Sequence, residues 1–406
     1  MSDFIDFNIP HAKLSEIQAA KLEDKISLEE LTTVLKKANN NSTPGSTGFT
    51  YAFYKFFWKQ LGPFIHQASN YSFNIGKLPS SQTIGIISLI PKGEKPKELL
   101  DSWRPITLLN SIYKLISGVI AQRINLVLPS IINNDQCGFV KGRYIGDCIR
   151  TTYDVIEYAK NNNKTGLLLL IDFKKAFDSI SFKFIEQTLI YFGFGPNLRK
   201  WINILLHDFK ACINHAGNIS QLFKIQRGCR QGDPIAAALF VMTIEILCIK
   251  LRKSNNINSF KIGTQNILLS LYADDCSIFL EYNAESLRNS IKILNDFYFT
   301  SGLQIQISKT QCVVFGKIPE NCNLCPELGL RWEQEFKLLG VNFNGTLRNM
   351  EINFENNLIE IKSVIQHWQY RFLSLIGRAC IAKTLLLSKL SHLASVIPTV
   401  NKNKLK

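Results

Sequence analysis

Residues Ile267–Tyr282 read ILLSLYADDCSIFLEY and carry the clearest structural signal in the chain. Two apolar runs rich in strand-forming side chains flank the short acidic segment Asp274-Asp275. This arrangement predicts a β-hairpin whose tip presents two adjacent carboxylates. Considered alone, the pair would be an ordinary polar turn, so its meaning depends on what the rest of the chain places beside it.

A third carboxylate closes a strand that an unbroken apolar run predicts. Leu167–Phe173 reads LLLLIDF, a pattern typical of a strand buried on both faces, and Asp172 lies at its end. A carboxylate in such surroundings is costly unless it is paired or binds a metal. Two divalent ions held by converging carboxylates promote phosphoryl transfer, and Mg²⁺ prefers such oxygen ligands. Asp172, Asp274 and Asp275 are therefore candidate metal ligands; the alternative is that Asp172 caps a helix.

The rest of the chain alternates predicted helices and strands. Turn-forming residues separate these elements, and Ser27 is a candidate N-cap for the helix that follows it. Helices are predicted over 11–38, 51–75, 108–128, 144–160, 181–208, 234–252, 284–300 and from about 350 onward; strands are predicted over 84–90, 303–315 and 335–343, with a hairpin over 211–225. Mixed strands, hairpins and helices predict an α+β fold with a helical C-terminal part.

The composition favours a polyanionic partner. The 406 residues are 46% hydrophobic, which is enough for a large core. The formal net charge is +15, and because residues 1–30 hold seven acids against three lysines, the remaining chain carries +19. Such a surplus suits nucleic acid or an anionic membrane. Residues 371–406 hold seven Lys or Arg and no acid, so this segment either follows a phosphate backbone or is an ordinary solvated helix face.

Other features argue against a membrane partner. The longest apolar stretch, Ile235–Leu247, is too short to span a bilayer and contains Thr243 and Glu245. The first 30 residues lack the basic start and apolar core of a signal peptide. Ten cysteines are scattered singly, apart from one CxxC at 322–325 without a second pair at zinc spacing, as expected of reduced thiols. We expect an intracellular location, either nuclear or in a cytoplasmic ribonucleoprotein.

Eight short motifs, in sequence order, resemble those of reverse transcriptases from LINE-type (non-long-terminal-repeat) retrotransposons. The hairpin tip YADD at 272–275 has the form of that family's catalytic hairpin, and IDFKKAFD at 171–178 resembles its first palm motif. The other six are the segment from TPG to YK at 43–55, WRPITLLN at 103–110, QCGFVKGR at 136–143, RQGDP at 230–234, the segment from SGL to the lysine at 301–309, and LLG at 338–340. The resemblance covers roughly residues 40–345.

This resemblance implies roles at the reaction centre. Asp172 and Asp274 would bind two Mg²⁺ ions, or Mn²⁺ in their place. Asp275 would complete the cluster, and the backbone carbonyl of Phe173 would add an oxygen ligand. Phe177 would lie against the 2′ carbon of the sugar and exclude ribonucleotides by steric clash.

The resemblance also implies contacts with the nucleotide and the template. Gln231 and Gly232 would contact the incoming nucleotide, because glycine permits a close backbone approach. Arg104 would meet the triphosphate, since a guanidinium suits bidentate phosphate contact. Lys141 and Arg143 would contact the template or its phosphates.

Lys309 would act as a general acid that protonates the departing pyrophosphate. The alternatives are a solvated turn lysine at Lys309, core packing at Phe177 and a surface salt bridge at Arg104. Two departures from the family pattern lie elsewhere. Residues 235–237 read IAA where the family has Leu-Ser-Pro, and Gln306 stands where it has Asn. Neither departure changes a predicted metal ligand.

The fold implied is a right-hand polymerase with fingers, palm and a partial helical thumb. Residues 1–40 would form an N-terminal helical extension, 41–165 the fingers, 166–345 the palm with interleaved fingers elements, and 346–406 the start of the thumb. The expected function is an RNA-directed DNA polymerase that extends a DNA primer on an RNA template with dNTPs, as part of a larger polyprotein. The alternatives are an inactive nucleic-acid-binding remnant and an RNA-dependent RNA polymerase, against which Phe177 argues.

Overall fold

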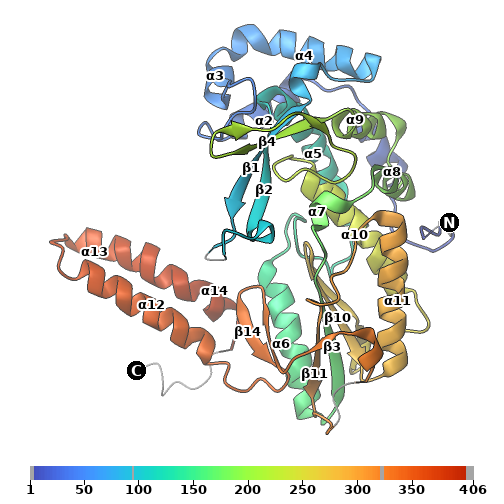
Figure 1. Ribbon diagram of the computed structural model, residues 1–406, viewed down its shortest axis with the longest axis vertical. Coiled ribbons are helices and arrows are strands. Elements are labelled where there is room, and N and C mark those ends of the chain that lie inside the picture. Colours follow the sequence, from blue (N-terminus) through green and yellow to red (C-terminus); the bar gives the residue numbers. More distant parts are fainter. Residues whose placement is uncertain (1–3, 94–95, 321–323, 399–406) are drawn as a thin grey trace.

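The computed structural model describes residues 4–93, 96–320 and 324–398, and it has the predicted mixture of helices and strands (Figure 1). Cys322 of the CxxC pair lies outside the described residues. The helices are α1 (Glu16–Leu22), α2 (Leu28–Lys37), α3 (Tyr51–Phe56), α4 (Trp58–Ile75), α5 (Ser111–Ile131), α6 (Ile145–Asn161), α7 (Ala176–Ser179), α8 (Phe182–Tyr191), α9 (Pro196–Leu206), α10 (Ala236–Arg252), α11 (Ala284–Ser301), α12 (Ile352–Trp368), α13 (Leu375–Ile381) and α14 (Ser388–Val396).

The strands form two larger sheets and two small hairpins. We call the sheet with the order β12-β11-β3-β10-β9 the central sheet, and the sheet with the order β2-β1-β4-β5, in which β6 also pairs with β4, the upper sheet. The strands are β1 (Ile84–Pro91), β2 (Trp103–Leu108), β3 (Thr165–Ile171), β4 (Lys210–His215), β5 (Asn218–Ile219), β6 (Phe223–Lys224), β7 (Phe260–Ile262), β8 (Gln265–Ile267), β9 (Leu269–Tyr272), β10 (Asp275–Glu281), β11 (Gln311–Gly316), β12 (Arg331–Trp332), β13 (Glu335–Leu338) and β14 (Val341–Asn344).

The middle strand of the central sheet is β3, which is buried on both faces as its apolar run predicts. Side chains alternate along a strand, so Leu167, Leu169 and Ile171 enter a core shared with α10 and α11. Leu168 points the other way, into a second core shared with α6. Figure 1 shows α6 and α11 on opposite sides of this sheet. The central sheet and the helices on its two faces therefore form three layers, which hold the end of β3 in a fixed position.

The upper sheet is built from two separate parts of the chain. Strands β1 and β2 pair antiparallel, and β1 pairs in parallel with β4, with Ile84–Ser88 beside Lys210–Asn214. The hairpin predicted over 211–225 supplies β4 to β6 and turns at Ala216-Gly217, both with positive φ. Helix α5 is buried along most of its length and packs against α2, α9 and α10. It thereby joins the upper sheet to the core beneath the central sheet.

The C-terminal part is helical, as predicted. Helices α12 and α13 project together from the body of the molecule (Figure 1), and α14 packs against α6 and α12. Across the residues that the structure describes, no helix has both the length and the apolar character that crossing a bilayer requires.

Several predicted elements differ from the structure. The single helices expected over 51–75 and 181–208 are each two helices, α3 with α4 and α8 with α9. The single helix expected over 11–38 is two helices, because Ser15 and Ser27 each begin a helix with a capping box. The strand expected over 335–343 is the hairpin β13–β14, which turns at Leu339-Gly340 with both φ angles positive. Of the strands expected over 303–315, only β11 forms a ladder, and Ile305 makes an isolated bridge to Phe173.

Candidate active site

The acidic hairpin predicted from the sequence is the β9–β10 hairpin at the edge of the central sheet. Asp275 pairs with Tyr272, which leaves Ala273 and Asp274 as a two-residue turn. Ala273 has a φ of 59°, a left-handed conformation that is uncommon for a residue with a Cβ atom. Asp274 and Asp275 are both exposed at this tip. The hairpin therefore presents two carboxylates to solvent on a strained turn.

Asp172 reaches the same place through the pairing of β3 with β10. Cys276 lies opposite Ile171, so one further residue of this antiparallel register sets Asp275 opposite Asp172. Although Asp275 is exposed as a residue, burial of its carboxyl group, followed by the charges of Asp274 and Asp172, raises its pKa to about 6. The structure thus brings Asp172 to the two adjacent acidic side chains Asp274 and Asp275, which lie far from it in the sequence.

The three carboxylates lie near one another but are not arranged as a metal site. Within the described ranges, no group of three His, Cys, Asp or Glu side chains is placed so that it could hold a metal ion. The Asp172 side chain is 47% exposed, and Lys309 Nζ lies 4.0 Å from its Oδ2 atom. Lys309 follows a turn in which its N–H donates to the carbonyl of Gln306, and the Gln306 N–H donates to the carbonyl of Asp172 (2.7 Å). The segment after α11 therefore carries a lysine to the end of β3, with Gln306 providing backbone contacts.

The carbonyl of Phe173 faces the hairpin rather than the segment after α11. Phe173 bridges Ile305, and the residues on either side of this pair are joined by backbone hydrogen bonds of 2.8 and 2.7 Å. That is the pattern of a pair whose own N–H and C=O groups point outward, away from each other. The Phe173 carbonyl consequently lies on the side of β3 that β10 occupies.

The ring of Phe177 lies between two other aromatic rings. It stacks on Phe240 of α10, with centroids 4.4 Å apart and an interplanar angle of 23°, and it meets Phe139 edge-on at 6.3 Å. Phe177 itself is half-buried, while Phe139 is exposed and has a positive φ. The ring is therefore fixed on one face and available on its remaining edge.

The RQGDP loop docks onto β2. The Thr107 N–H donates to the Gln231 carbonyl (2.8 Å), and Gly232 has a φ of 111°. A Cβ atom at Gly232 would lie 2.6 Å from the Thr107 carbonyl oxygen. The close backbone approach predicted at Gly232 is thus an approach to β2 in this structure, and it joins the loop before α10 to the upper sheet.

Arg230 and Asp233 hold that loop in place, a role that the motif alone did not predict. Their ion pair is 3.0 Å long, and both side chains are almost fully buried. Asp233 accepts hydrogen bonds from the hydroxyls of Tyr113 (2.6 Å) and Ser117, and the Arg230 guanidinium lies over the ring of Phe209. Breaking a buried pair by removing one partner costs several kcal/mol, about 3–5, so these two residues are structural supports. Their partners come from distant helices and loops, so only the fold reveals them.

Of the remaining predicted contact residues, two have exposed side chains and one is hydrogen-bonded within the protein. Arg104 on β2 and Lys141 are exposed. Arg143 instead donates hydrogen bonds to the carbonyls of Ile132, Asn133 and Gln136, where it closes the loop after α5. Its guanidinium is engaged with the protein, so we retain only Lys141 as a candidate template contact.

A comparison with known families now identifies the class of protein. The reverse transcriptase (RNA-dependent DNA polymerase) family matches residues 90–343, more than half of the chain. The chain therefore belongs to this family, as the motifs predict, and its fold is that of a right-hand polymerase.

The similar curated proteins are named as products of transposons and retrotransposable elements. The chain is 28% identical over 384 residues to the "Transposon TX1 uncharacterized 149 kDa protein" of Xenopus laevis, covering 93% of this chain and 29% of that protein. It is 26% identical over 238 residues to a "Retrovirus-related Pol polyprotein from type-1 retrotransposable element R2" of Popillia japonica, covering 58% and 32%. The chain therefore spans less than a third of either relative. A telomerase structure from Candida tropicalis aligns over 86% of this chain and 58% of its own, at 14% identity and a TM-score of 0.47.

Proposed function

We propose that this chain is the RNA-directed DNA polymerase part of a LINE-type retrotransposon protein, and that it extends a DNA primer on an RNA template with dNTPs. The observation that carries the proposal is the meeting of Asp172, Asp274 and Asp275 at the hairpin tip, in a chain of the reverse transcriptase family. Nucleotidyl transfer needs positioning and charge stabilisation more than covalent help from the protein. Converging carboxylates can hold cations that position the reactants and stabilise the developing charge.

The donor set fits two divalent cations such as Mg²⁺, with Mn²⁺ as a substitute. Carboxylate and carbonyl oxygens are the ligands that these ions prefer. The raised pKa of Asp275 reflects burial first and then repulsion from Asp274 and Asp172, and a bound cation would relieve this repulsion. Asp172 and Asp274 would hold both ions, and Asp275 and the Phe173 carbonyl would complete the set. When bound, the ions stabilise charge on the attacking and leaving oxygens.

The other groups have roles that follow from their positions. Lys309, beside Asp172, would donate a proton to the departing pyrophosphate. Phe177, fixed against Phe240, would exclude a 2′-hydroxyl. Gln231 would contact the incoming nucleotide.

Three further assignments complete the proposal. Gly232 would let the nucleotide approach the loop backbone, Arg104 would bind the triphosphate and Lys141 would contact the template. In this scheme the upper sheet belongs to the fingers (41–165 with the interleaved hairpin), the central sheet to the palm (166–345), residues 1–40 to an N-terminal extension and 346–406 to the start of a thumb.

Primer extension tests this function directly. Wild-type protein should extend oligo(dT) on poly(A) with Mg²⁺ and dTTP, whereas Asp274→Asn should abolish extension and leave primer–template binding nearly unchanged, because the variant removes a metal ligand without removing positive charge. Asp296→Asn, an exposed aspartate on α11, is the matched control and should extend normally. Extension by Asp274→Asn at the wild-type rate would refute the metal assignment. A wild-type chain that binds primer–template but never extends it would instead be a binding remnant.

A further inference from the structure

The catalytic hairpin is paired on its outer side by the QCGF segment of the loop after α5. Strand β9 is the last strand of the central sheet, yet Gln136 bridges Leu271 in parallel. The Cys137 N–H donates to the Leu271 carbonyl (2.7 Å), and the Leu271 N–H donates to the Asp135 carbonyl (2.8 Å). An edge strand that carries reactive groups is thus fixed by a short segment from the other side of the molecule.

One side chain of this segment binds both backbone groups of the turn residue Ala273. Gln136 Oε1 accepts the N–H of Ala273 (3.1 Å) and the N–H of Gly138 (2.7 Å), and Gln136 Nε2 lies 3.4 Å from the Ala273 carbonyl, to which it donates. Gln136 is only 1% exposed. A Cβ atom at Gly138 would lie 2.2 Å from the Ala273 nitrogen, so only glycine allows this approach. Gln136 therefore holds the left-handed conformation of Ala273, directly before Asp274 and Asp275.

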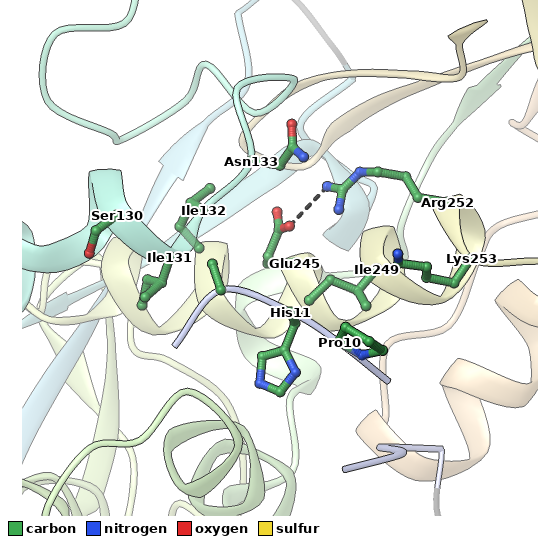
Figure 2. A pocket seen from close by; sticks show the side chains of 11 residues that line it. Pro10, His11, Ser130, Ile131, Ile132, Asn133, Glu245, Ile249, Arg252 and Lys253 are labelled. Carbon is green, nitrogen blue, oxygen red and sulfur yellow. Dashed lines mark hydrogen bonds and ion pairs between the residues drawn. The ribbon is translucent and has the colours of Figure 1, made fainter. Parts of the chain in front are cut away.

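The segment is in turn anchored by a partly buried ion network. Arg252, the last residue of α10, donates to both carboxylate oxygens of Asp135 (2.9 and 3.1 Å) and to Glu245 (2.9 Å). Figure 2 shows Glu245 paired with Arg252 beside Asn133, in the wall of a pocket of about 340 Å³. No predicted catalytic residue lines this pocket, so the network lies behind the reaction centre and does not belong to it. Because Arg252 of α10 binds Asp135, neither Asp135 nor its neighbour Gln136 can shift without disturbing α10.

We propose that Gln136 is a positioning residue for the catalytic hairpin: through Ala273 it sets the direction of Asp274 and Asp275. The proposal rests on the proposed polymerase function for its catalytic consequence, but its structural part does not need activity. Groups that orient metal ligands from the next shell of contacts typically change metal affinity about 10- to 100-fold when removed. We therefore expect loss of Gln136 to weaken Mn²⁺ binding by at least about tenfold and to lower kcat, with little change in primer–template affinity.

The test compares four proteins: wild type, Gln136→Met, Gln136→Glu and Val140→Ala. Gln136→Met keeps the volume and removes the amide. Gln136→Glu keeps an acceptor for the two N–H groups and should recover part of the loss. Val140→Ala changes a buried residue directly after this segment; it lowers stability without removing a side-chain hydrogen bond to the hairpin, and it controls for a general effect on folding. Three measurements are made on each: hydrogen–deuterium exchange over residues 269–276, Mn²⁺ binding by electron paramagnetic resonance, and single-turnover primer extension.

Faster exchange at the hairpin and weaker Mn²⁺ binding in Gln136→Met, but not in Val140→Ala, are the expected results. Unchanged hairpin exchange in a folded Gln136→Met protein would overturn the inference, whatever its extension rate. A wild-type chain without extension, combined with faster hairpin exchange in Gln136→Met, would refute the proposed polymerase and leave the positioning role standing. The exchange result therefore separates the two failures.

Discussion

Burial of the Asp275 carboxyl group at the β9–β10 turn, together with the negative charges of Asp274 and Asp172, raises its pKa to about 6. A carboxyl with a raised pKa keeps its proton to higher pH, so in the metal-free protein Asp275 favours folding at low pH and loses that contribution as the pH rises through about 6. A metal ion must displace the same proton. A decrease in metal affinity at acidic pH is therefore the experimental sign of the carboxylate cluster.

We predict that Mn²⁺ affinity falls about tenfold for each pH unit below 6 and levels off above it, since one proton competes with the ion. Titrations at pH 5, 6, 7 and 8 would measure this. Asp275→Asn should bind more weakly at every pH and lose most of the dependence. A wild-type affinity that is flat between pH 5 and 7 would contradict a shared site.

Phe177 provides the second prediction at the scale of a residue. Its ring is held against Phe240, so its remaining edge has a fixed position. If that edge excludes a 2′-hydroxyl, Phe177→Val should raise kcat/KM for rUTP relative to dTTP by about 10- to 100-fold, the range expected when a small steric block is removed. Phe139→Leu, which changes the exposed neighbouring ring, should have a much smaller effect. Unchanged sugar selectivity in Phe177→Val would remove the argument against an RNA polymerase.

At the scale of elements, the loop before α10 depends on its contact with β2. Gly232→Ala would place a Cβ atom against the Thr107 carbonyl at a φ of 111°, so both a clash and backbone strain result. We predict a loss of about 1–3 kcal/mol in the free energy of unfolding, measured by urea denaturation. Gly217→Ala has a positive φ but open space around it, so it reports strain alone and should cost less. Equal effects of the two substitutions would show that the contact with β2 is unimportant.

The elements that local patterns predicted well are those with strong, self-contained signals. The hairpin at 267–282, the buried run of β3 and the Ser27 cap each depend on neighbours in the sequence. The role of Gln136 was not predicted, although its motif was identified, because its partner Ala273 lies far along the chain. Arg230 was missed for the same reason: a buried ion pair is defined by the helices that surround it. Long-range hydrogen bonds leave no periodic trace in a sequence.

The hairpin β13–β14, predicted from the sequence as a single strand over 335–343, shows the opposite limit. Residues 335–343 read EFKLLGVNF, which suits a single strand, and only the positive φ angles of Leu339 and Gly340 divide it into β13 and β14. A leucine in the left-handed region is unusual, so no residue type before the glycine marks the turn. The reason for the break lies in packing, since Phe336 and Phe343 stack on each other across the hairpin.

At the scale of the whole molecule, charge should dominate nucleic-acid binding. The chain carries +15 overall, because residues 1–30 have a net charge of −4 and the remaining residues +19. We predict that the logarithm of primer–template affinity falls with the logarithm of salt concentration with a slope steeper than about −3, because each neutralised phosphate contributes roughly −0.7 to −0.9. Fluorescence anisotropy between about 50 and 300 mM salt, a roughly sixfold range over which the screening length shortens, would measure it. Asp274→Asn should keep the same slope, and a flat response would mean that phosphates are not the main contact.

The parallel pairing of β1 with β4 has a consequence for how the molecule is made. On the ribosome, β1 emerges long before β4, because β3 and Asp172 lie between them in the sequence and are synthesised first. Until β4 arrives, one side of β1 is an open edge able to pair with another nascent chain. A piece cut at residue 165 would keep that edge permanently exposed. Expression of residues 41–165 alone, the proposed fingers, therefore calls for grafting residues 209–225 beside β1, while the uncut chain covers this edge only after β3 has been synthesised.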